Sequence, residues 1–301
     1  MHRNRIEQLK PLKKHERKRL GIQLLAAALA NGYLIGYAKG TIFTGSTKLA
    51  CVPVLNCYSC PGALGSCPVG SLQAVLGGNR HNFSFYVVGL VMLFGVLLGR
   101  LICGVLCPFG LVQDLVHRLP TKKWTVPLKI DGPLRYLKYI IGLVMVVLLP
   151  IFFTNQFGLA PPYFCKYLCP AGTLGGGIPL LAMNESLRRL IGALFGWKML
   201  TLILILMAAI FVSRPFCKYL CPLGAFYALF NRFSFFQMHL DQDKCIDCGL
   251  CEKVCPMEVE VRKNINHPEC IRCGRCKAVC PTQAIHDGVQ LKPRTVQIDI
   301  K

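Results

Sequence analysis

Four apolar runs alternate with polar and basic segments along the chain of 301 residues. The runs cover 20–38, 83–102, 134–153 and 196–212. About 20 apolar residues in a helix cross the hydrocarbon core of a bilayer. The pattern therefore predicts a mainly α-helical membrane protein, with a basic N-terminus at 1–19 and a domain of four transmembrane helices at 20–235.

The distribution of basic residues predicts how these spans are oriented. Lysine and arginine are frequent in residues 1–19 and again in the loop after the second run. Because basic loops stay in the cytoplasm, both termini are expected there, in a prokaryotic cytoplasmic membrane, with 41–82 and 154–195 outside. Ala28-Leu29-Ala30 fits a signal-peptide cleavage site, but the apolar run continues to Tyr37, which favours an uncleaved anchor. We also expect a short amphipathic helix at 111–119.

Composition supports the membrane assignment. Hydrophobic residues make up 53% and charged residues 16% of the chain, whereas soluble domains carry about 25% charge. The net charge of +21 could suggest nucleic-acid binding. The basic residues lie at the ends of the apolar runs, which argues against that function.

The soluble segment 236–301 contains two tandem cysteine runs of the form Cys-x2-Cys-x2-Cys-x3-Cys-Pro. This is the spacing of bacterial ferredoxins with two clusters, in which the fourth cysteine ligates the other cluster. It predicts a small cytoplasmic α+β domain with two [4Fe-4S] clusters, and positive φ at Gly249 and Gly274. The predicted ligands are Cys245, Cys248, Cys251 and Cys280 for cluster 1, and Cys270, Cys273, Cys276 and Cys255 for cluster 2. Zinc sites and disulfides are the alternatives, and neither accounts for the tandem runs.

Three copies of Cys-x3-Cys-Pro-x-Gly lie near the apolar runs, and the heptapeptide Phe-Cys-Lys-Tyr-Leu-Cys-Pro occurs twice, at 164–170 and 216–222. Cysteines four residues apart share one face of a helix, so each pair supplies half of the four thiolates of a [4Fe-4S] cluster. The proline is expected to end or kink the helix. The predicted orientation pairs the copies at the cytoplasmic ends of spans, which gives an inner cluster on Cys103, Cys107, Cys217 and Cys221.

The remaining copy, Cys165 and Cys169, needs a partner on the outer side. Cys67-Pro68-Val69-Gly70 fits half of the motif, but Ala63 stands where its other cysteine is expected. The predicted outer cluster is therefore held by Cys67, Cys165, Cys169 and one of Cys60 or Cys57. Cys51 and the cysteine left over are candidates for a disulfide, and redox-active thiols without a cluster are the alternative for both membrane sets.

At these motifs the chain resembles the membrane iron–sulfur family of NapH, the quinol-dehydrogenase component of periplasmic nitrate reduction, and of the membrane half of NosR. The shared features are four spans, Cys-x3-Cys-Pro after spans, and a two-cluster ferredoxin domain. Three clear copies of Cys-x3-Cys-Pro and the Cys57-x2-Cys60-Pro61 stretch depart from NapH-like members. The resemblance implies an electron-transfer subunit of a hetero-complex, similar to a quinol dehydrogenase.

The sequence thus favours transmembrane electron transfer between a cytoplasmic ferredoxin-like donor or the quinone pool and an extracytoplasmic redox protein. A redox sensor and an assembly factor for a metalloenzyme are the alternatives. No catalytic acid or nucleophile stands out. His81, His117 and His239 are the candidates for quinone contact. No histidine falls within a predicted span and no Cys-x-x-Cys-His is present, so haem is not expected.

Overall fold

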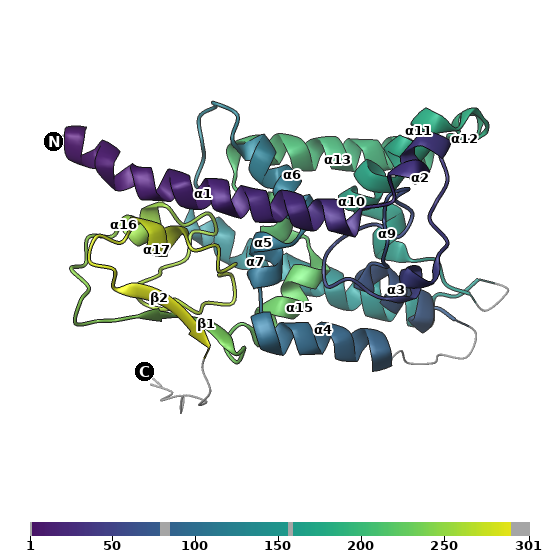
Figure 1. Ribbon diagram of the computed structural model, residues 1–301. Coiled ribbons are helices and arrows are strands. Elements are labelled where there is room, and N and C mark those ends of the chain that lie inside the picture. The colour runs from purple at the N-terminus through teal and green to yellow at the C-terminus, as the bar shows by residue number, and fades with distance from the viewer. Residues whose placement is uncertain (1, 79–84, 156–158, 290–301) are drawn as a thin grey trace.

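The computed structural model describes residues 2–78, 85–155 and 159–289. Most of these residues are helical, and the longest helices run side by side along the length of the molecule (Figure 1). The two strands lie at one end and the helices α2, α3, α11 and α12 at the other (Figure 1). The first half of the chain contains α1 (His2–Ala30), α2 (Leu34–Lys39), η1 (Ser46–Leu49), α3 (Pro68–Leu76), α4 (Phe85–Leu98), α5 (Leu101–Val105) and α6 (Pro108–His117).

The second half begins with one continuous helical stretch and ends in short elements. The helical elements are α7 (Leu128–Ile141), η2 (Gly142–Leu148), α8 (Leu149–Phe152), α9 (Tyr163–Tyr167), α10 (Pro170–Gly172), η3 (Thr173–Gly177), α11 (Ile178–Met183), α12 (Glu185–Arg189), α13 (Ala193–Phe211), α14 (Pro215–Tyr219) and α15 (Pro222–Phe230). The C-terminal elements are β1 (Phe236–Leu240), α16 (Leu250–Lys253), α17 (Arg275–Val279) and β2 (Ile285–Val289).

Two helices are long and apolar enough to cross a membrane. They are Lys129–Phe152, which joins α7, η2 and α8, and Ala193–Phe211, which is α13. α4 is apolar but has only 14 residues. Of the four predicted spans, the third and fourth thus meet this criterion within the described residues.

The first predicted span is interrupted. α1 continues the basic N-terminal segment without a break and ends at Ala30. There the chain 62–64 packs against the helix end: Leu64 donates to the Ala30 carbonyl oxygen, and Tyr33 donates to the oxygen of Gly62. Gly32 allows this approach, because a Cβ there would lie 3.1 Å from the Leu64 side chain. The apolar run therefore forms two separate helices, α1 and α2, instead of one continuous span.

The second predicted span also ends early. α4 stops at Leu98 because Gly99 takes a left-handed φ of 54°. The next backbone amide, that of Arg100, donates to the Asn231 side chain instead of continuing the helix. The chain then turns into α5, which carries the first cysteine of the inner set.

α6 covers most of the segment predicted as a surface amphipathic helix. It packs between α1 and α13, and Phe109, Gln113 and Asp114 are buried. The prediction of a helix is therefore correct, but one face of it is buried against other helices while Leu115 stays exposed. The carboxylate of Asp114 explains this position, because it binds Arg19 of α1 and Arg214 before α14.

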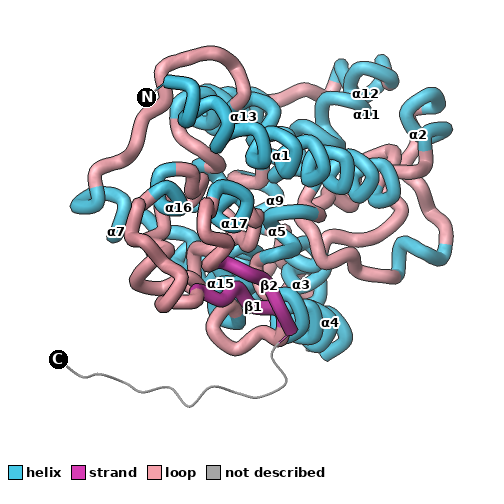
Figure 2. The backbone as a smooth tube through the Cα atoms, turned by 60° about the vertical axis from the view of Figure 1, so that its left-hand side comes forward, coloured by secondary structure: helices cyan, strands magenta, loops and turns pink. Residues whose placement is uncertain are grey.

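The C-terminal elements form a compact unit against the ends of the long helices. β1 and β2 pair antiparallel, from Phe236 opposite Val289 to Leu240 opposite Ile285 (Figure 2). α17 packs along α1, where Arg275 pairs with Glu16 and His15 Nε2 lies 2.8 Å from the Cys273 carbonyl oxygen. One apolar core joins this unit to the long helices, because Ile271 and Met257 belong to it.

Candidate metal centres

The eight C-terminal cysteines gather into the two predicted groups. One pocket is lined by Cys245, Cys248, Cys251 and Cys280, and a second by Cys255, Cys270, Cys273 and Cys276. Each group thus contains the crossing cysteine from the other run. Burial raises the pKa of the Cys270 thiol to about 12, and the Cys273 and Cys255 thiols add to this rise.

Glycines set the backbone beside each of these groups. Gly249 and Gly274 have φ of 68° and 73° and precede α16 and α17. This left-handed conformation strains any residue with a Cβ. The sequence-based prediction of positive φ at both positions is confirmed.

The inner set is buried and close together. Cys103, Cys107, Cys217 and Cys221 are each at most 7% exposed. Burial raises the pKa of Cys217 to about 11 against the lowering effect of Arg214, and the Cys107 thiol adds to the rise. Burial likewise raises the pKa of Cys221, and the Cys217 and Cys103 thiols act in the same direction. The four thiols therefore lie within electrostatic range of one another.

The Cys-Pro-x-Gly part of the motif begins a helix. Cys67, Cys107, Cys169 and Cys221 are the N-cap residues of α3, α6, α10 and α15, each with proline at the first helical position. In the last copy the Gly224 amide donates a hydrogen bond to Cys221 Sγ at 3.3 Å. The expectation that proline only ends or kinks a helix is thus incomplete, because proline suits the first turn. Helix N-termini also favour a thiolate.

Two buried arginines link the halves of the inner set, and the sequence analysis did not single them out. Arg100 donates to the Cys217 carbonyl oxygen at 3.2 Å, and Arg214 donates to the Cys103 carbonyl oxygen at 2.6 Å. Each arginine stands three residues before the first cysteine of its own motif. Each therefore belongs to one half-site and donates to the backbone of the other. The spacing Arg-x2-Cys-x3-Cys-Pro, present at these two copies and absent at 162–170, is the signal that identifies them.

Each of these arginines has a buried carboxylate partner. Arg214 binds Asp114, and Arg100 binds Glu269 at 2.7 Å. Burial acts to raise the pKa of Glu269, but Arg100 and Lys138 lower it to about 2. The guanidinium groups thus remain charged beside the thiols. Positive charge there offsets the negative charge that four thiolates bring into a buried site.

The outer set includes Cys57. Burial raises the pKa of Cys67 to about 12 and that of Cys165 to about 11, and the Cys57 thiol adds to both rises. A Cβ on Gly172 would lie 3.6 Å from Cys57 Sγ and 4.0 Å from Cys169 Sγ. Both sulfur atoms are therefore close to Gly172. Cys57 therefore occupies the position left vacant in the motif by Ala63.

Cys60 and Cys51 lie in other surroundings. Cys60 Sγ is 3.0 Å from the Tyr37 hydroxyl and 3.4 Å from Asn31 Oδ1. Cys51 donates to the Ser71 hydroxyl at 3.5 Å. All eighteen cysteines are free thiols in the structure, so the suggested disulfide is not formed.

Two glutamines contact the membrane cysteines. The motifs considered in the sequence did not include them. Gln113 Nε2 donates to Cys217 Sγ at 3.1 Å, and Gln73 Nε2 donates to Cys165 Sγ at 3.4 Å. Each stands six residues after the cysteine of a Cys-Pro-x-Gly copy. The extended spacing Cys-Pro-x-Gly-x2-Gln occurs at 67–73 and 107–113 and marks both residues.

The four groups are in contact in a fixed order. α16, which contains Cys251, packs against α17, which contains Cys276. The cluster 2 loop meets the inner set, since a Cβ on Gly104 would lie 2.2 Å from the Ile271 carbonyl oxygen. The inner and outer sets share one buried core, to which Leu55, Cys67 and Cys107 belong. Tyr227, fully buried, donates to the Pro53 carbonyl oxygen at 2.9 Å. Its hydroxyl interacts electrostatically with Cys103, Cys107 and Cys221 of the inner set and with Cys67 of the outer set.

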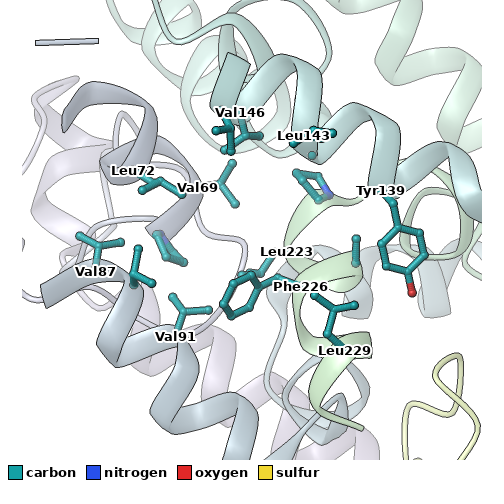
Figure 3. A pocket seen from close by; sticks show the side chains of 16 residues that line it. Val69, Leu72, Val87, Val91, Tyr139, Leu143, Val146, Leu223, Phe226 and Leu229 are labelled. Atoms are coloured by element: carbon teal, nitrogen blue, oxygen red, sulfur yellow. The ribbon is translucent and has the colours of Figure 1, made fainter. Parts of the chain in front are cut away.

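An apolar pocket of about 300 Å³ lies among helices from both halves of the chain. α3, α4, α7 with η2, and α15 line it, and Val69, Val91, Val146 and Phe226 point into it (Figure 3). Its wall includes Pro68 and Pro222, the residues that follow Cys67 and Cys221. Tyr139 contributes a hydroxyl at one side.

Two of the three candidate histidines, His117 and His239, are not among the described residues that line this pocket. His117 Nδ1 lies 3.0 Å from the Ala209 carbonyl oxygen, and His239 stacks on His286 with ring centroids 5.4 Å apart. His81 lies outside the described residues.

The donor sets fit iron–sulfur clusters better than single metal ions. Within the part of the chain that the structure describes, no group of three or more His, Cys, Asp or Glu side chains could hold one ion. A [4Fe-4S] cluster takes four cysteine thiolates, one on each iron, so its ligands lie farther apart. Each of the four groups supplies four thiols, which are mostly buried in the inner and outer sets and partly exposed in the cluster 1 group.

Comparisons with known proteins agree with this chemistry. The profile of a 4Fe-4S binding domain family matches residues 81–127, 139–198 and 194–240, and that of a 4Fe-4S dicluster domain matches 237–281. An uncharacterised protein of Methanocaldococcus jannaschii is 30% identical over 66% of this chain and 68% of its own. The methylamine utilization ferredoxin-type protein MauN of Paracoccus denitrificans is 31% identical over 76% and 71%. The ferredoxin-type protein NapH of Haemophilus influenzae is 26% identical over 59% and 54%. No solved structure matches.

Proposed function

Because the chain belongs to the family of 4Fe-4S ferredoxin-type electron-transport proteins that includes NapH, NosR and MauN, we propose that it carries electrons across a membrane through four cluster sites. The observation that carries this proposal is the contact order of the four cysteine groups. α16 packs on α17, the cluster 2 loop meets the inner set at Gly104, and Tyr227 lies between the inner and outer sets. A [4Fe-4S] cluster at each site would accept and release one electron at a time.

The protein's own residues prepare these sites. Cys245, Cys248, Cys251 and Cys280 hold cluster 1, and Cys255, Cys270, Cys273 and Cys276 hold cluster 2. Cys103, Cys107, Cys217 and Cys221 hold the inner cluster, and Cys57, Cys67, Cys165 and Cys169 the outer one. Arg100 and Arg214 hold the two inner half-sites together through hydrogen bonds to cysteine carbonyl oxygens. Their positive charge offsets the negative charge of the four thiolates.

The membrane orientation is part of this proposal. The two long apolar helices cross the bilayer, and α4 with the apolar half of α1 completes four membrane helices. Support comes from large apolar side chains that are exposed on all four, among them Leu25, Leu93, Ile140 and Leu204. Residues 236–301 then form a cytoplasmic ferredoxin domain, and the outer set faces the opposite compartment.

The electron partners follow from the two ends of the series. Cys248 is exposed, so a cytoplasmic ferredoxin-like protein can approach cluster 1. The quinone pool is the other proposed donor, and the apolar pocket beside Pro68 and Pro222 suits a quinone ring or its isoprenoid tail. An extracytoplasmic redox protein accepts electrons at the outer set, as part of a hetero-complex.

Iron analysis of anaerobically purified protein tests the number of sites. Four [4Fe-4S] clusters require about sixteen Fe per chain. About eight Fe would leave only the two ferredoxin clusters and would refute a relay through the membrane sites.

Vesicles test the transport itself. We expect reduced ferredoxin inside sealed vesicles to reduce an impermeant acceptor outside when the protein is present. Cys217→Ala should remove the inner cluster and abolish this flow, whereas Cys60→Ala should leave it unchanged, because Cys60 Sγ contacts the Tyr37 hydroxyl and Asn31 Oδ1. Clusters that cycle without net flow would instead support a redox sensor or an assembly factor.

A further inference from the structure

Gln73 and Gln113 form a matched pair of buried side chains. Both are fully buried. The Oε1 of Gln113 accepts the Phe216 amide at 3.1 Å, and the Oε1 of Gln73 accepts the Phe164 amide at 2.9 Å. Because a backbone amide can only donate, it fixes the oxygen of each side chain. The amide nitrogen is therefore directed to the cysteine sulfur.

The remaining contacts of the two glutamines are also equivalent. Gln113 Nε2 donates to the Phe109 carbonyl oxygen, and Gln73 Nε2 donates to that of Val69, four residues earlier in each case. Within the described residues, every polar atom of both side chains thus has a partner. The two sites share one local design, because each joins a Cys-Pro-x-Gly-x2-Gln segment to one copy of Phe-Cys-Lys-Tyr-Leu-Cys-Pro.

We propose that Gln113 and Gln73 are positioning residues that tune the reduction potentials of the inner and outer clusters, each through one N–H···S hydrogen bond. Hydrogen bonds to sulfur are among the determinants of the potential of such clusters. A donor stabilises the more electron-rich reduced state, so each glutamine raises the potential of its own cluster. This inference rests on the proposed function, since it requires the two membrane clusters.

The two cysteine sets differ in the charged side chains around them, although their glutamine contacts are equivalent. The inner cysteines lie beside two arginines, whereas the charged neighbours of the outer set include lysines, Lys198 near Cys57 and Cys165 and Lys48 near Cys57. The two glutamines therefore raise the reduction potentials of both membrane clusters. The potentials still differ, because the charged groups around the two clusters differ. The glutamine at each site can therefore be altered without changing the charge around the other site.

The test is a redox titration of the anaerobically purified full chain, followed by electron paramagnetic resonance. Gln113→Met should lower the midpoint of one membrane cluster, and Gln73→Met should lower that of the other. We expect about a tenfold fall in the reduced-to-oxidised ratio at a fixed potential, which is about 59 mV for one electron. The two ferredoxin clusters should not shift in either variant.

Two further variants separate tuning from folding. Gln113→Glu keeps the acceptor for the Phe216 amide and removes the amide donor to sulfur, so its midpoint should also fall while the iron content stays at the wild-type value. Gln237→Met, which alters a glutamine whose side chain donates to the Arg232 carbonyl oxygen, should change nothing.

The inference is overturned if the midpoints stay in place in a protein with about sixteen Fe, or if both variants shift the same cluster. Loss of the inner cluster from both Gln113 variants would also overturn it, because the side chain would then hold the site together instead of tuning it. About eight Fe in the wild type would refute the proposed function and this inference together, and the iron content distinguishes that failure from the others.

Discussion

At the scale of single residues, the outer set is where the choice of ligand matters most. Cys57 and Cys60 are three positions apart and both lie in the outer loop. Cys57 lies with the sulfurs of Cys67, Cys165 and Cys169, whereas Cys60 lies against Tyr37 and Asn31. We therefore assign the fourth ligand to Cys57.

Paired substitutions distinguish the two cysteines. Cys57→Ala should lose the outer cluster, which lowers the iron content by about four Fe per chain, because three thiolates leave one iron without a protein ligand. Cys60→Ala should retain the full iron content. Iron analysis and the loss of one paramagnetic signal measure both results. The reverse outcome, with iron lost from Cys60→Ala only, would show that the outer loop is bound differently.

At the scale of elements, the contact between α5 and the C-terminal unit controls how cluster 2 meets the inner set. Gly104 lies between Cys103 and Cys107, where the other two copies of the motif have lysine, Lys166 and Lys218. The Ile271 carbonyl oxygen approaches so closely that a Cβ at Gly104 would lie 2.2 Å from it. Because this neighbour is backbone, it cannot move aside as a side chain would.

Gly104→Ala should therefore destabilise the protein by about 1–3 kcal/mol, the usual cost of overpacking. Thermal unfolding in detergent measures the change. Gly89→Ala in α4 is the matched control, since nothing lies within 4 Å of the added Cβ, and it should be neutral or gain up to about 1 kcal/mol. Equal melting temperatures for the two variants would argue against a tight contact at Ile271.

At the scale of the whole molecule, the two ends carry different elements. α17 and the strands lie at one end beside the first half of α1, whereas α2, α11 and α12 lie at the other (Figure 1). Our proposal assigns the first end to the cytoplasm. Leu49 and Leu190, both highly exposed, lie in the segments assigned to the outside.

Reporter fusions test this orientation. A reporter enzyme that is active only outside the cytoplasm should be active when inserted after Leu49 or Leu190, and inactive when fused to the C-terminus. Activity measured in intact cells, with expression levels as the control, decides the result. An active C-terminal fusion would reverse the proposed direction of the relay.

Much of this organisation can be read from the sequence. The tandem cysteine runs predict which cysteines group together in the C-terminal unit, because the crossing fourth ligand is a property of the spacing. Hydrophobic periodicity predicts the long helices of 129–152 and 193–211. It does not predict the breaks at Asn31 and Gly99, which depend on hydrogen bonds from residues 62–64 and from Asn231.

The sequence by itself determined the chemistry of this protein: iron–sulfur ligands at fixed spacings, a ferredoxin-type C-terminal segment and apolar helices. Only the tertiary structure decided that Cys57 joins the outer set, that Arg100 and Arg214 exchange contacts across the inner set, and that Gln73 and Gln113 reach sulfur atoms about 100 positions away. The physical reason is that spacing fixes local geometry, whereas contacts between distant segments depend on how the helices pack.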